Sequence, residues 1–372
     1  LLIFDIKRNG VGLDDAARAK LNEIQMNLSQ LQAKFNSNIL KSSQRFKITL
    51  KKQSSVANMP QQLKRLLSQN AVKDGIHSAT TEDGPWVINP DCYQQCMKYL
   101  TSRKMREVLY RAQVSRATKT PVDNTSIMHS ILSERFKLAK LLGYNNYAEM
   151  SLDSKMATSV EEVFSLLTFL GEHAIPIAKQ EMSDLVEFVK LHEEKDMTLE
   201  PWDVPYWSER LKESKYLFKE EELNAYFPLE NVLQGLFSTV ERLFEVKVVE
   251  CPSGQHQVWH PDVRVFYIHH PSNSSSSGGS EVTPLAVFYL DPYSRPGRKK
   301  EGNWMNPVVT RSTALKKMVP VAHLVLNIPP PIAGDTHSLM TLGEVETLFH
   351  EVGHGLQHML TTVDHSTTSG AN

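Results

Sequence analysis

His350, Glu351 and His354 form the pattern His-Glu-x-x-His near the C-terminal end of this 372-residue sequence. On an α-helix, residues four apart lie one turn apart on the same face, so His350 and His354 can direct two imidazole nitrogens at one metal ion. Zinc is the metal that this pair of ligands favours. Glu351 is rotated by about 100° from His350 and can reach a water on the metal, where a carboxylate acts as a general base. The pattern therefore predicts a hydrolase site with two metal ligands and one catalytic base.

The sequence around this pattern predicts the helix that the chemistry requires. Thr341-Leu342-Gly343-Glu344 is typical of a capping box at a helix N-terminus. Gly353 and Gly355 each disfavour a helix by about 1 kcal/mol, which indicates that another group approaches the backbone there. An ordinary amphipathic helix with solvated histidines is the alternative. Apolar residues recur at spacings of three and four, roughly opposite the histidines; they are Val345, Phe349, Val352, Leu356 and Met359.

The composition is that of a globular protein. The chain has 41 Lys and Arg against 42 Asp and Glu, and this balance argues against a polyanion-binding surface, so we expect no nucleic-acid partner. The longest apolar candidate, residues 318–328, is shorter than the roughly 20 residues that span a bilayer, so we expect no membrane partner. The three cysteines, Cys92, Cys96 and Cys251, form no Cys-x-x-Cys pair and fit a reducing compartment.

Helices dominate the chain up to about residue 245, and several strands follow. A seam of apolar residues from Ala17 to Phe35 predicts a long helix packed against another helix of the same domain. The predicted N-caps are Asp14 or Asp15, Asn124, Ser159 in a capping box, and Asp203. Segments rich in β-branched and aromatic residues predict strands at residues 46–50, 86–88, 246–249, 263–268, 285–290 and 319–326. A Ser/Gly-rich stretch at residues 271–280 predicts a hairpin loop. The expected fold class is mainly α with a small β-sheet (α+β).

These segments together resemble the thimet oligopeptidase and oligopeptidase A family of zinc metallopeptidases, family M3. The resemblance covers essentially the whole chain and looks closest to the oligopeptidase A and plant organellar branch. It rests on residues 343–360, which are similar to the metal helix of that family, and on residues 105–112, 141–149, 201–207, 226–229 and 288–295.

The resemblance implies a zincin-like, two-lobed helical body with a central channel that admits only short, unstructured peptides. We therefore expect a partial helical N-terminal lobe over residues 1–155 and a partial catalytic lobe over residues 156–372. Val352 stands where the family commonly has an aromatic residue. Gln357, which is followed by His358, stands where the family commonly has a histidine. Neither departure involves a ligand or the base, so we expect modulation of activity rather than loss.

The resemblance assigns His350 and His354 as zinc ligands and Glu351 as the general base. The third zinc ligand of the family is a glutamate on a following helix, and we expect it, with the groups that stabilise the transition state, beyond Asn372. The sequence begins without methionine and stops soon after the metal helix, so both ends look cut. A transit peptide is among the segments that could precede it.

The expected function is that of a zinc-dependent metalloendopeptidase, an oligopeptidase of peptide turnover with one Zn²⁺ per chain. Zinc would polarise the scissile carbonyl and activate a water, while Glu351 would take the proton and pass it to the leaving amine. We expect a short peptide to pair with an exposed strand, for which residues 319–326 are the candidate.

Two alternatives stay open at this point. One is a catalytically inactive peptide-binding or interaction protein that retains the fold, and the other is a different metallopeptidase class with the same helix. For the expected peptidase, we expect a monomer. We expect it in the cytoplasm, or in an organelle matrix or stroma if a transit peptide precedes the sequence.

Overall fold

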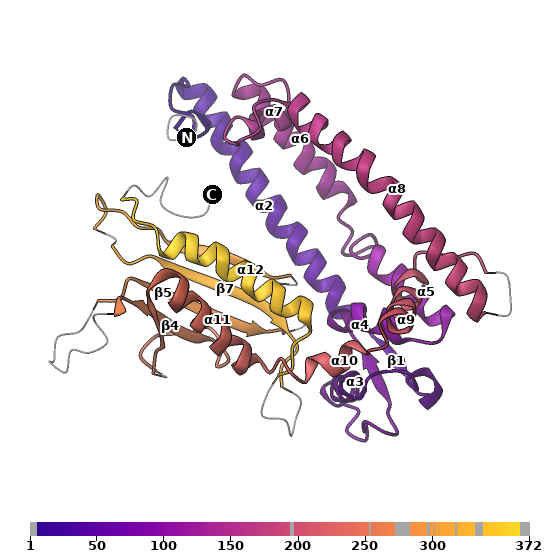
Figure 1. Cartoon of the computed structure of the whole chain (residues 1–372). Helices are drawn as coiled ribbons and strands as arrows, with labels where there is room; N and C mark the ends of the chain where they lie inside the picture. The colour runs from indigo at the N-terminus through magenta and orange to yellow at the C-terminus, as the bar shows by residue number, and fades with distance from the viewer. Residues whose placement is uncertain are drawn as a thin grey trace. The chain divides into compact units, whose positions relative to one another are not determined.

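The computed structural model of the chain describes residues 6–193, 197–252, 254–271, 283–295, 298–300, 302–316, 318–331 and 338–364. The chain divides into two compact units, Leu1–Leu217 and Phe218–Asn372, called unit 1 and unit 2 below. Unit 1 is mostly helical, whereas unit 2 contains a five-stranded sheet (Figure 1). The expected class, mainly α with a small β-sheet, is confirmed.

The elements of unit 1 are mainly helices connected by short segments. They are α2 (Asp15–Arg45), β1 (Ile48–Leu50), η1 (Gln53–Ser55), α3 (Gln61–Lys73), β2 (Trp86–Ile88), η2 (Pro90–Cys92), α4 (Tyr93–Tyr99), α5 (Arg103–Val114), α6 (Thr125–Leu141), α7 (Tyr147–Leu152), α8 (Val160–His192) and α9 (Val204–Tyr216). Strands β1 and β2 pair antiparallel. Helix α2 packs along α6, so the predicted partner of the apolar seam is a helix of the same unit (Figure 1).

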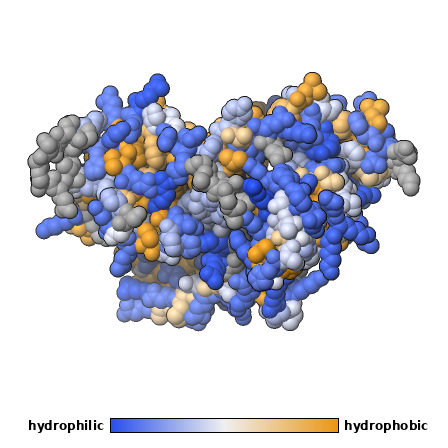
Figure 2. Space-filling model, turned by 90° about the horizontal axis from the view of Figure 1, so that it is seen from below, coloured by the Kyte–Doolittle hydropathy of each residue, from blue (hydrophilic) through white to orange (hydrophobic). Residues whose placement is uncertain are grey.

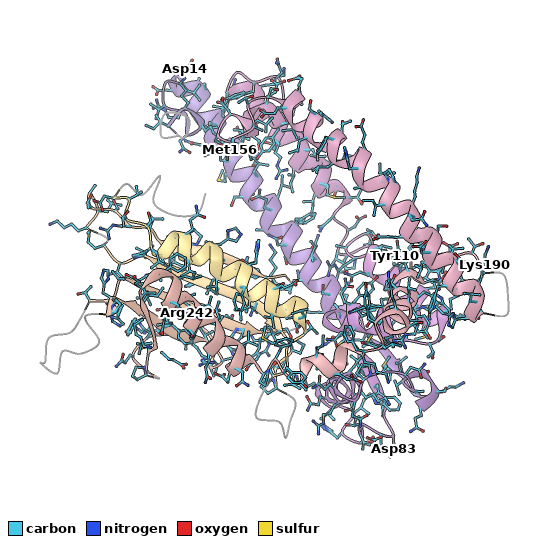
Figure 3. All side chains as sticks on the ribbon, in the orientation of Figure 1. Asp14, Asp83, Tyr110, Met156, Lys190 and Arg242 are labelled. Atoms are coloured by element: carbon cyan, nitrogen blue, oxygen red, sulfur yellow. The ribbon has the colours of Figure 1, made fainter. Side chains whose placement is uncertain are left out.

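Two of the predicted N-caps are confirmed by hydrogen bonds. Asp14 lies at the N-terminal end of α2, where its carboxylate accepts a bond from the backbone N–H of Ala17 (Figure 3). Ser159 accepts a bond from the backbone N–H of Glu162 in the first turn of α8. The carboxylate of Glu162 accepts from Thr158 rather than from the backbone N–H of Ser159. The return bond of the predicted capping box therefore reaches the residue before the N-cap.

At the other two N-cap positions, the side chains bond elsewhere. Asn124 precedes α6, but its side chain accepts from Asn38 of α2 and makes no capping bond. Asp203 precedes α9 and is fully buried, where it forms ion pairs with Arg103 and Arg106. Charged and amide partners that are distant in sequence therefore outcompete the local helix N–H groups for these two side chains.

The boundary of the compact units differs from the lobe boundary expected after residue 155. Helix α8 packs on α9, and α9 packs on α4. The ion pairs of Asp203 with Arg103 and Arg106 attach the start of α9 to α5. These contacts hold residues up to Leu217 in unit 1. The two lobes of a larger body stay a prediction.

Unit 2 places its helices against one sheet. Its elements are α10 (Glu220–Asn224), α11 (Leu229–Phe244), β3 (Lys247–Glu250), β4 (Arg264–His269), β5 (Ala286–Tyr293), β6 (Trp304–Val309), β7 (Val321–Ile328) and α12 (Leu342–Met359). The strand order is β3-β4-β5-β7-β6, with only the β5–β7 pair parallel. The four strands predicted after residue 245 correspond to β3, β4, β5 and β7.

Strand β6 was not predicted. It contains Asn306 and Pro307, two residue types that are depleted in strands. Proline is tolerated in an edge strand, and β6 is one of the two edges of the described sheet. The prediction failed because the sequence does not show which strand lies at an edge.

Helices α11 and α12 cover one face of the sheet with the apolar core of unit 2 (Figure 1). Alternate residues of the inner strands enter this core, among them Phe266, Phe288 and Leu324. Leu348 and Val352 of α12 pack against the same cluster. One side of α12 thus forms part of the apolar core, and this packing holds the helix on the sheet.

The remaining sequence predictions concern surface segments. Residues 272–280 of the predicted Ser/Gly-rich loop lie outside the described residues. Within the described ranges, no helix combines the length and the apolar character that a bilayer span requires. The face of the molecule in Figure 2 is mainly hydrophilic, with hydrophobic residues in separate small patches.

Candidate active site

Helix α12 carries the three residues predicted to do the chemistry. It begins after Thr341, whose Oγ1 accepts a bond from the backbone N–H of Glu344 at 3.2 Å. The carboxylate of Glu344 accepts in return from the backbone N–H of Thr341 at 2.7 Å. This reciprocal pair satisfies two of the N–H groups that a helix start leaves without partners. The predicted capping box is confirmed.

The two sides of α12 have different surroundings. His350 and His354 are exposed, as are Gly353 and Gln357 between and beyond them. Phe349 was predicted on the apolar side but is 40% exposed, because Leu348 takes the central core position one residue earlier. The buried residues of the helix are Leu348, Glu351, Val352, Gly355, His358 and Met359, and Leu348, Val352 and Met359 among them lie roughly opposite the two histidines.

The sheet side of α12 approaches strands β6 and β7 closely at Gly355. A Cβ atom on Gly355 would lie 3.3 Å from Leu324 Cδ2 and 3.9 Å from Met305 Cγ. The predicted approach of another group to the helix backbone is therefore confirmed at this glycine. At Gly353, a Cβ atom would meet nothing within 4 Å among the described residues.

The imidazole rings of His350 and His354 converge on the exposed side of α12. Their Nε2 atoms are 3.0 Å apart, and the ring planes are inclined at 86°. Two nitrogens bound to one tetrahedral zinc at the usual bond length lie about 3.3 Å apart. The pair therefore fits two adjacent ligands of a zinc ion. Within the described ranges, no group of three or more His, Cys, Asp and Glu side chains could hold a metal.

Glu351 occupies a position between the two sides of the helix. It is only 9% exposed, although it neighbours the exposed His350 in the sequence. At about 100° per residue, the helix turns Glu351 away from His350 towards the sheet side. Its carboxylate is therefore sheltered from solvent, although the preceding residue, His350, is exposed. Its role as a base stays a prediction.

His358 is a further polar residue of α12 that sequence reasoning did not assign to a function. It is completely buried, and its Nε2 lies 3.0 Å from the carbonyl oxygen of Val309 and 3.2 Å from that of Val321. Its Nδ1 is buried without a hydrogen-bond partner in the described part of the chain. The sequence signal was a histidine on the apolar side, one turn after His354.

The prediction that residues 319–326 form an exposed strand for a peptide is wrong. Residues 319–326 fall largely in β7, which pairs with β5 on one side and with β6 on the other. An interior strand has no free edge, so its backbone cannot pair with a peptide. The edges of the described sheet are β3 and β6, and β6 is the one that contacts α12.

A second polar cluster lies at the end of β5, away from the histidine pair in the sequence. Asp291 is 2% exposed and accepts bonds from Trp259 Nε1 and Arg295 Nη1, each at 2.9 Å. Lys299 Nζ is 3.0 Å from the same carboxylate. Burial alone would raise the pKa of Asp291, but these hydrogen bonds outweigh it and hold the pKa below its ordinary value. Burial lowers the pKa of Lys299 despite this partner.

Comparison with known proteins shows the family of the chain. Its sequence matches Peptidase family M3 over residues 96–372. Organellar oligopeptidase A, chloroplastic/mitochondrial, of Arabidopsis thaliana is 43% identical in an alignment of 371 positions that covers 97% of this chain and 45% of that protein. Probable cytosolic oligopeptidase A of Arabidopsis thaliana is 41% identical over 97% of this chain and 51% of its own length. Oligopeptidase A of Escherichia coli is 34% identical over 98% of this chain and 52% of its own length.

The chain spans about half the length of these relatives. The family match covers the sheet, helix α12 and much of unit 1. The predicted resemblance is therefore confirmed over both units. The chain belongs to peptidase family M3, a family of zinc metallopeptidases with a zincin-like fold.

Proposed function

We propose that the full-length protein is a zinc-dependent metalloendopeptidase that hydrolyses short, unstructured peptides. The observation that carries this proposal is the convergence of the His350 and His354 Nε2 atoms, 3.0 Å apart on the exposed side of α12, with Glu351 following His350 on the same helix. Membership of peptidase family M3 supports a peptidase, and the names of the relatives support an oligopeptidase.

His350 and His354 would hold the zinc ion as two of three protein ligands. Their exposure leaves room for a third ligand and for a substrate on the same side of the helix. When bound, zinc supplies Lewis-acid polarisation of the scissile carbonyl. We propose that the third ligand belongs to a part of the protein beyond Asn372.

Glu351 would move the proton during hydrolysis. Its carboxylate takes a proton from the attacking water as the water oxygen bonds to the carbonyl carbon. As the carbon–nitrogen bond breaks, Glu351 returns that proton to the leaving amine. The helix places the carboxylate one residue from His350, so base and ligands move as one rigid group.

The edge strand β6 is the candidate to hold the peptide backbone. It pairs with β7 on one side only within the described sheet, and it contacts α12. An extended peptide that adds a strand at this edge would be bound through backbone hydrogen bonds, largely without regard to its sequence. This proposal replaces the interior residues 319–326 with residues 304–309.

The alternative is a peptide-binding protein without catalysis. Such a protein would keep the edge strand but would not need two histidines and a glutamate in this arrangement, so the intact set favours the hydrolase. We further propose a monomer that acts in the cytoplasm or in an organelle matrix or stroma, because the relatives include an organellar and a cytosolic protein by name.

The test uses the full-length protein with Glu351→Gln, a change that removes the base and keeps the shape. Hydrolysis of a quenched fluorescent peptide is expected to fall by about 10²–10⁴-fold while the zinc content stays at the wild-type value. Glu346→Gln is the matched control, because Glu346 is exposed on the same helix, and it is expected to keep full activity. A wild-type rate for Glu351→Gln with zinc bound would overturn the assignment.

A further inference from the structure

His358 is a buried imidazole whose bonding uses only one of its two nitrogens. Both neighbours of Nε2 are carbonyl oxygens, which only accept, so Nε2 carries the hydrogen and donates to Val309 and Val321 together. The lone pair then lies on Nδ1, which has no partner among the described residues. A buried polar atom without a partner is unfavourable, and an apolar side chain would avoid it. What the imidazole contributes at this position is therefore the Nε2–H donor.

The two carbonyls lie where the β6–β7 ladder is irregular. Pro307 pairs with Ala322, and the next aligned pair is Val309 with Val321, so Val308 is an extra residue in β6. Such a bulge interrupts the ladder locally, and Pro307 has no N–H to donate. The bond of His358 to both strands thus falls at the point where strand pairing is weakest.

The other irregularity of the sheet is secured in the same way. The β5–β7 register shifts between Asp291 and Tyr293, and the buried Lys299 Nζ donates to the carbonyl oxygens of both residues, at 3.0 and 2.9 Å. That register shift lies between two interior strands, β5 and β7. The shift beside His358 affects β6, which forms an edge of the described sheet.

Helix α12 brings this bond into a fixed relation with the histidine pair. His358 follows His354 by one turn and His350 by two turns of a continuous helix. The same rigid element therefore carries both predicted metal ligands and the donor that holds the end of β6. A peptide that pairs with β6 takes its register from that strand.

We propose that His358 is a positioning residue that fixes edge strand β6 to α12 and thereby sets the register of a bound peptide against His350 and His354. This inference rests on the proposed function of the site. Without the Nε2–H donor, the carbonyls of Val309 and Val321 lose their common partner and the end of β6 loosens. A peptide then binds more weakly and in more than one register.

The first measurement is steady-state hydrolysis of a quenched fluorescent peptide by full-length variants. His358→Phe keeps a planar ring and removes the donor, and we expect KM to rise about tenfold with a smaller change in kcat. Mass spectrometry of the products is expected to show additional cleavage positions. His358→Gln places an amide N–H near the position of Nε2 and is expected to restore most of the KM and the wild-type products.

This pattern separates positioning from a purely structural role. A variant that only destabilises the fold would lower the fraction of active enzyme, and so kcat, without a change in KM or in the cleavage positions. If His358→Phe shows that result with wild-type zinc content, the inference is overturned.

The second measurement does not depend on activity. Hydrogen–deuterium exchange of the full-length protein is expected to be faster over residues 304–309 in His358→Phe than in the wild type or His358→Gln. Exchange in α2 and α6 is expected to stay unchanged. If the wild type hydrolyses no peptide, the proposed function fails while the exchange result still decides whether His358 holds β6. If the wild type is active and His358→Phe leaves KM or the exchange of β6 unchanged, the inference about His358 is overturned.

Discussion

Two polar clusters of unit 2 are built in opposite ways. In the buried cluster, the Asp291 carboxylate accepts from three side chains, and Lys299 also donates to two backbone carbonyls. In the exposed cluster, His350 and His354 direct similar nitrogens at one another across 3.0 Å. Opposite charges in the first cluster satisfy each other within the fold. In the second cluster, one ring nitrogen can donate to the other in a single hydrogen bond, and the same convergence would let both nitrogens bind one cation.

From this difference we expect the first cluster to hold the fold and the second to bind a ligand. A buried charge that loses its partner destabilises the protein, because the remaining charge stays out of water. An exposed side chain that loses its neighbour is solvated and changes stability little. Substitutions in the buried cluster should therefore affect unfolding, and those in the exposed cluster should affect metal binding and catalysis.

The largest effect is expected for His354→Ala in the full-length protein. Peptide hydrolysis should fall by roughly 10³-fold or more, because loss of the metal removes several kcal/mol of transition-state stabilisation. The free energy of unfolding of the metal-free protein should change by less than about 0.5 kcal/mol. Gln357→Ala, at an exposed position of the same helix, serves as the control and should keep activity. A large loss of stability of metal-free His354→Ala would show that the exposed histidines hold the fold, which contradicts the difference drawn between the two clusters.

Asp291→Asn is expected to act on the fold instead. It leaves the buried Lys299 without its counter-charge, and we expect unfolding to become easier by about 3–5 kcal/mol in urea titrations. The folded fraction should still bind zinc. Asp364→Asn removes an ion pair with Arg311 in which the carboxylate side chain is 47% exposed, and it should cost less than about 1 kcal/mol. Equal effects of the two substitutions would contradict the structural role of the Asp291 cluster.

The difference in unfolding free energy between wild type and Asp291→Asn should become smaller as the pH falls into the acid range. The folded state holds the pKa of Asp291 below its ordinary value, so the contribution is complete above the unfolded pKa of about 3.9 and is lost as the pH falls through the lower folded value. Urea titrations at pH 7, 5, 4 and 3 should show a constant difference down to pH 5 and a smaller one below pH 4. A difference that shrinks between pH 7 and 5 would assign the effect to another group.

The smallest effects are expected at the two glycines of α12. Gly353→Ala should stabilise the folded state by up to about 1 kcal/mol, because a Cβ there meets nothing within 4 Å in the part of the chain that the structure describes, and alanine favours the helix. Gly355→Val should destabilise it by about 1–3 kcal/mol, since atoms beyond a Cβ that is already 3.3 Å from Leu324 must displace the sheet contact. Thermal unfolding of both variants measures these changes in stability. A stabilised Gly355→Val with a destabilised Gly353→Ala would contradict the close approach of the sheet at Gly355.

Local sequence patterns predicted much of the fold. The capping box at Thr341 and the seam of α2 depend on residues within a few turns, and both are present. The side-chain partners of Asn124 and Asp203 were missed, because Asn38 and Arg103 are 86 and 100 residues away in the sequence. Strand β6 was missed because its Asn306 and Pro307 are acceptable only at an edge, and edges are set by tertiary structure.

The candidate site shows the same limit. The spacing of His350 and His354 follows from one helix and could be predicted from the sequence alone. The role inferred for His358 requires knowing that β6 and β7 are neighbours and that their register shifts beside Val309 and Val321. The choice of β6 over β7 as the peptide-binding edge likewise required the order of strands in the sheet.

The zinc content of the full-length protein tests the assignment of the exposed cluster most directly. We predict one zinc ion per chain in the wild type and none in the double variant His350→Ala, His354→Ala, each purified without chelator and measured by mass spectrometry of the metal. The variant should unfold in urea as the metal-free wild type does. A wild type without zinc after incubation with the metal, or a double variant that retains one zinc per chain, would contradict a zinc site on the exposed side of α12.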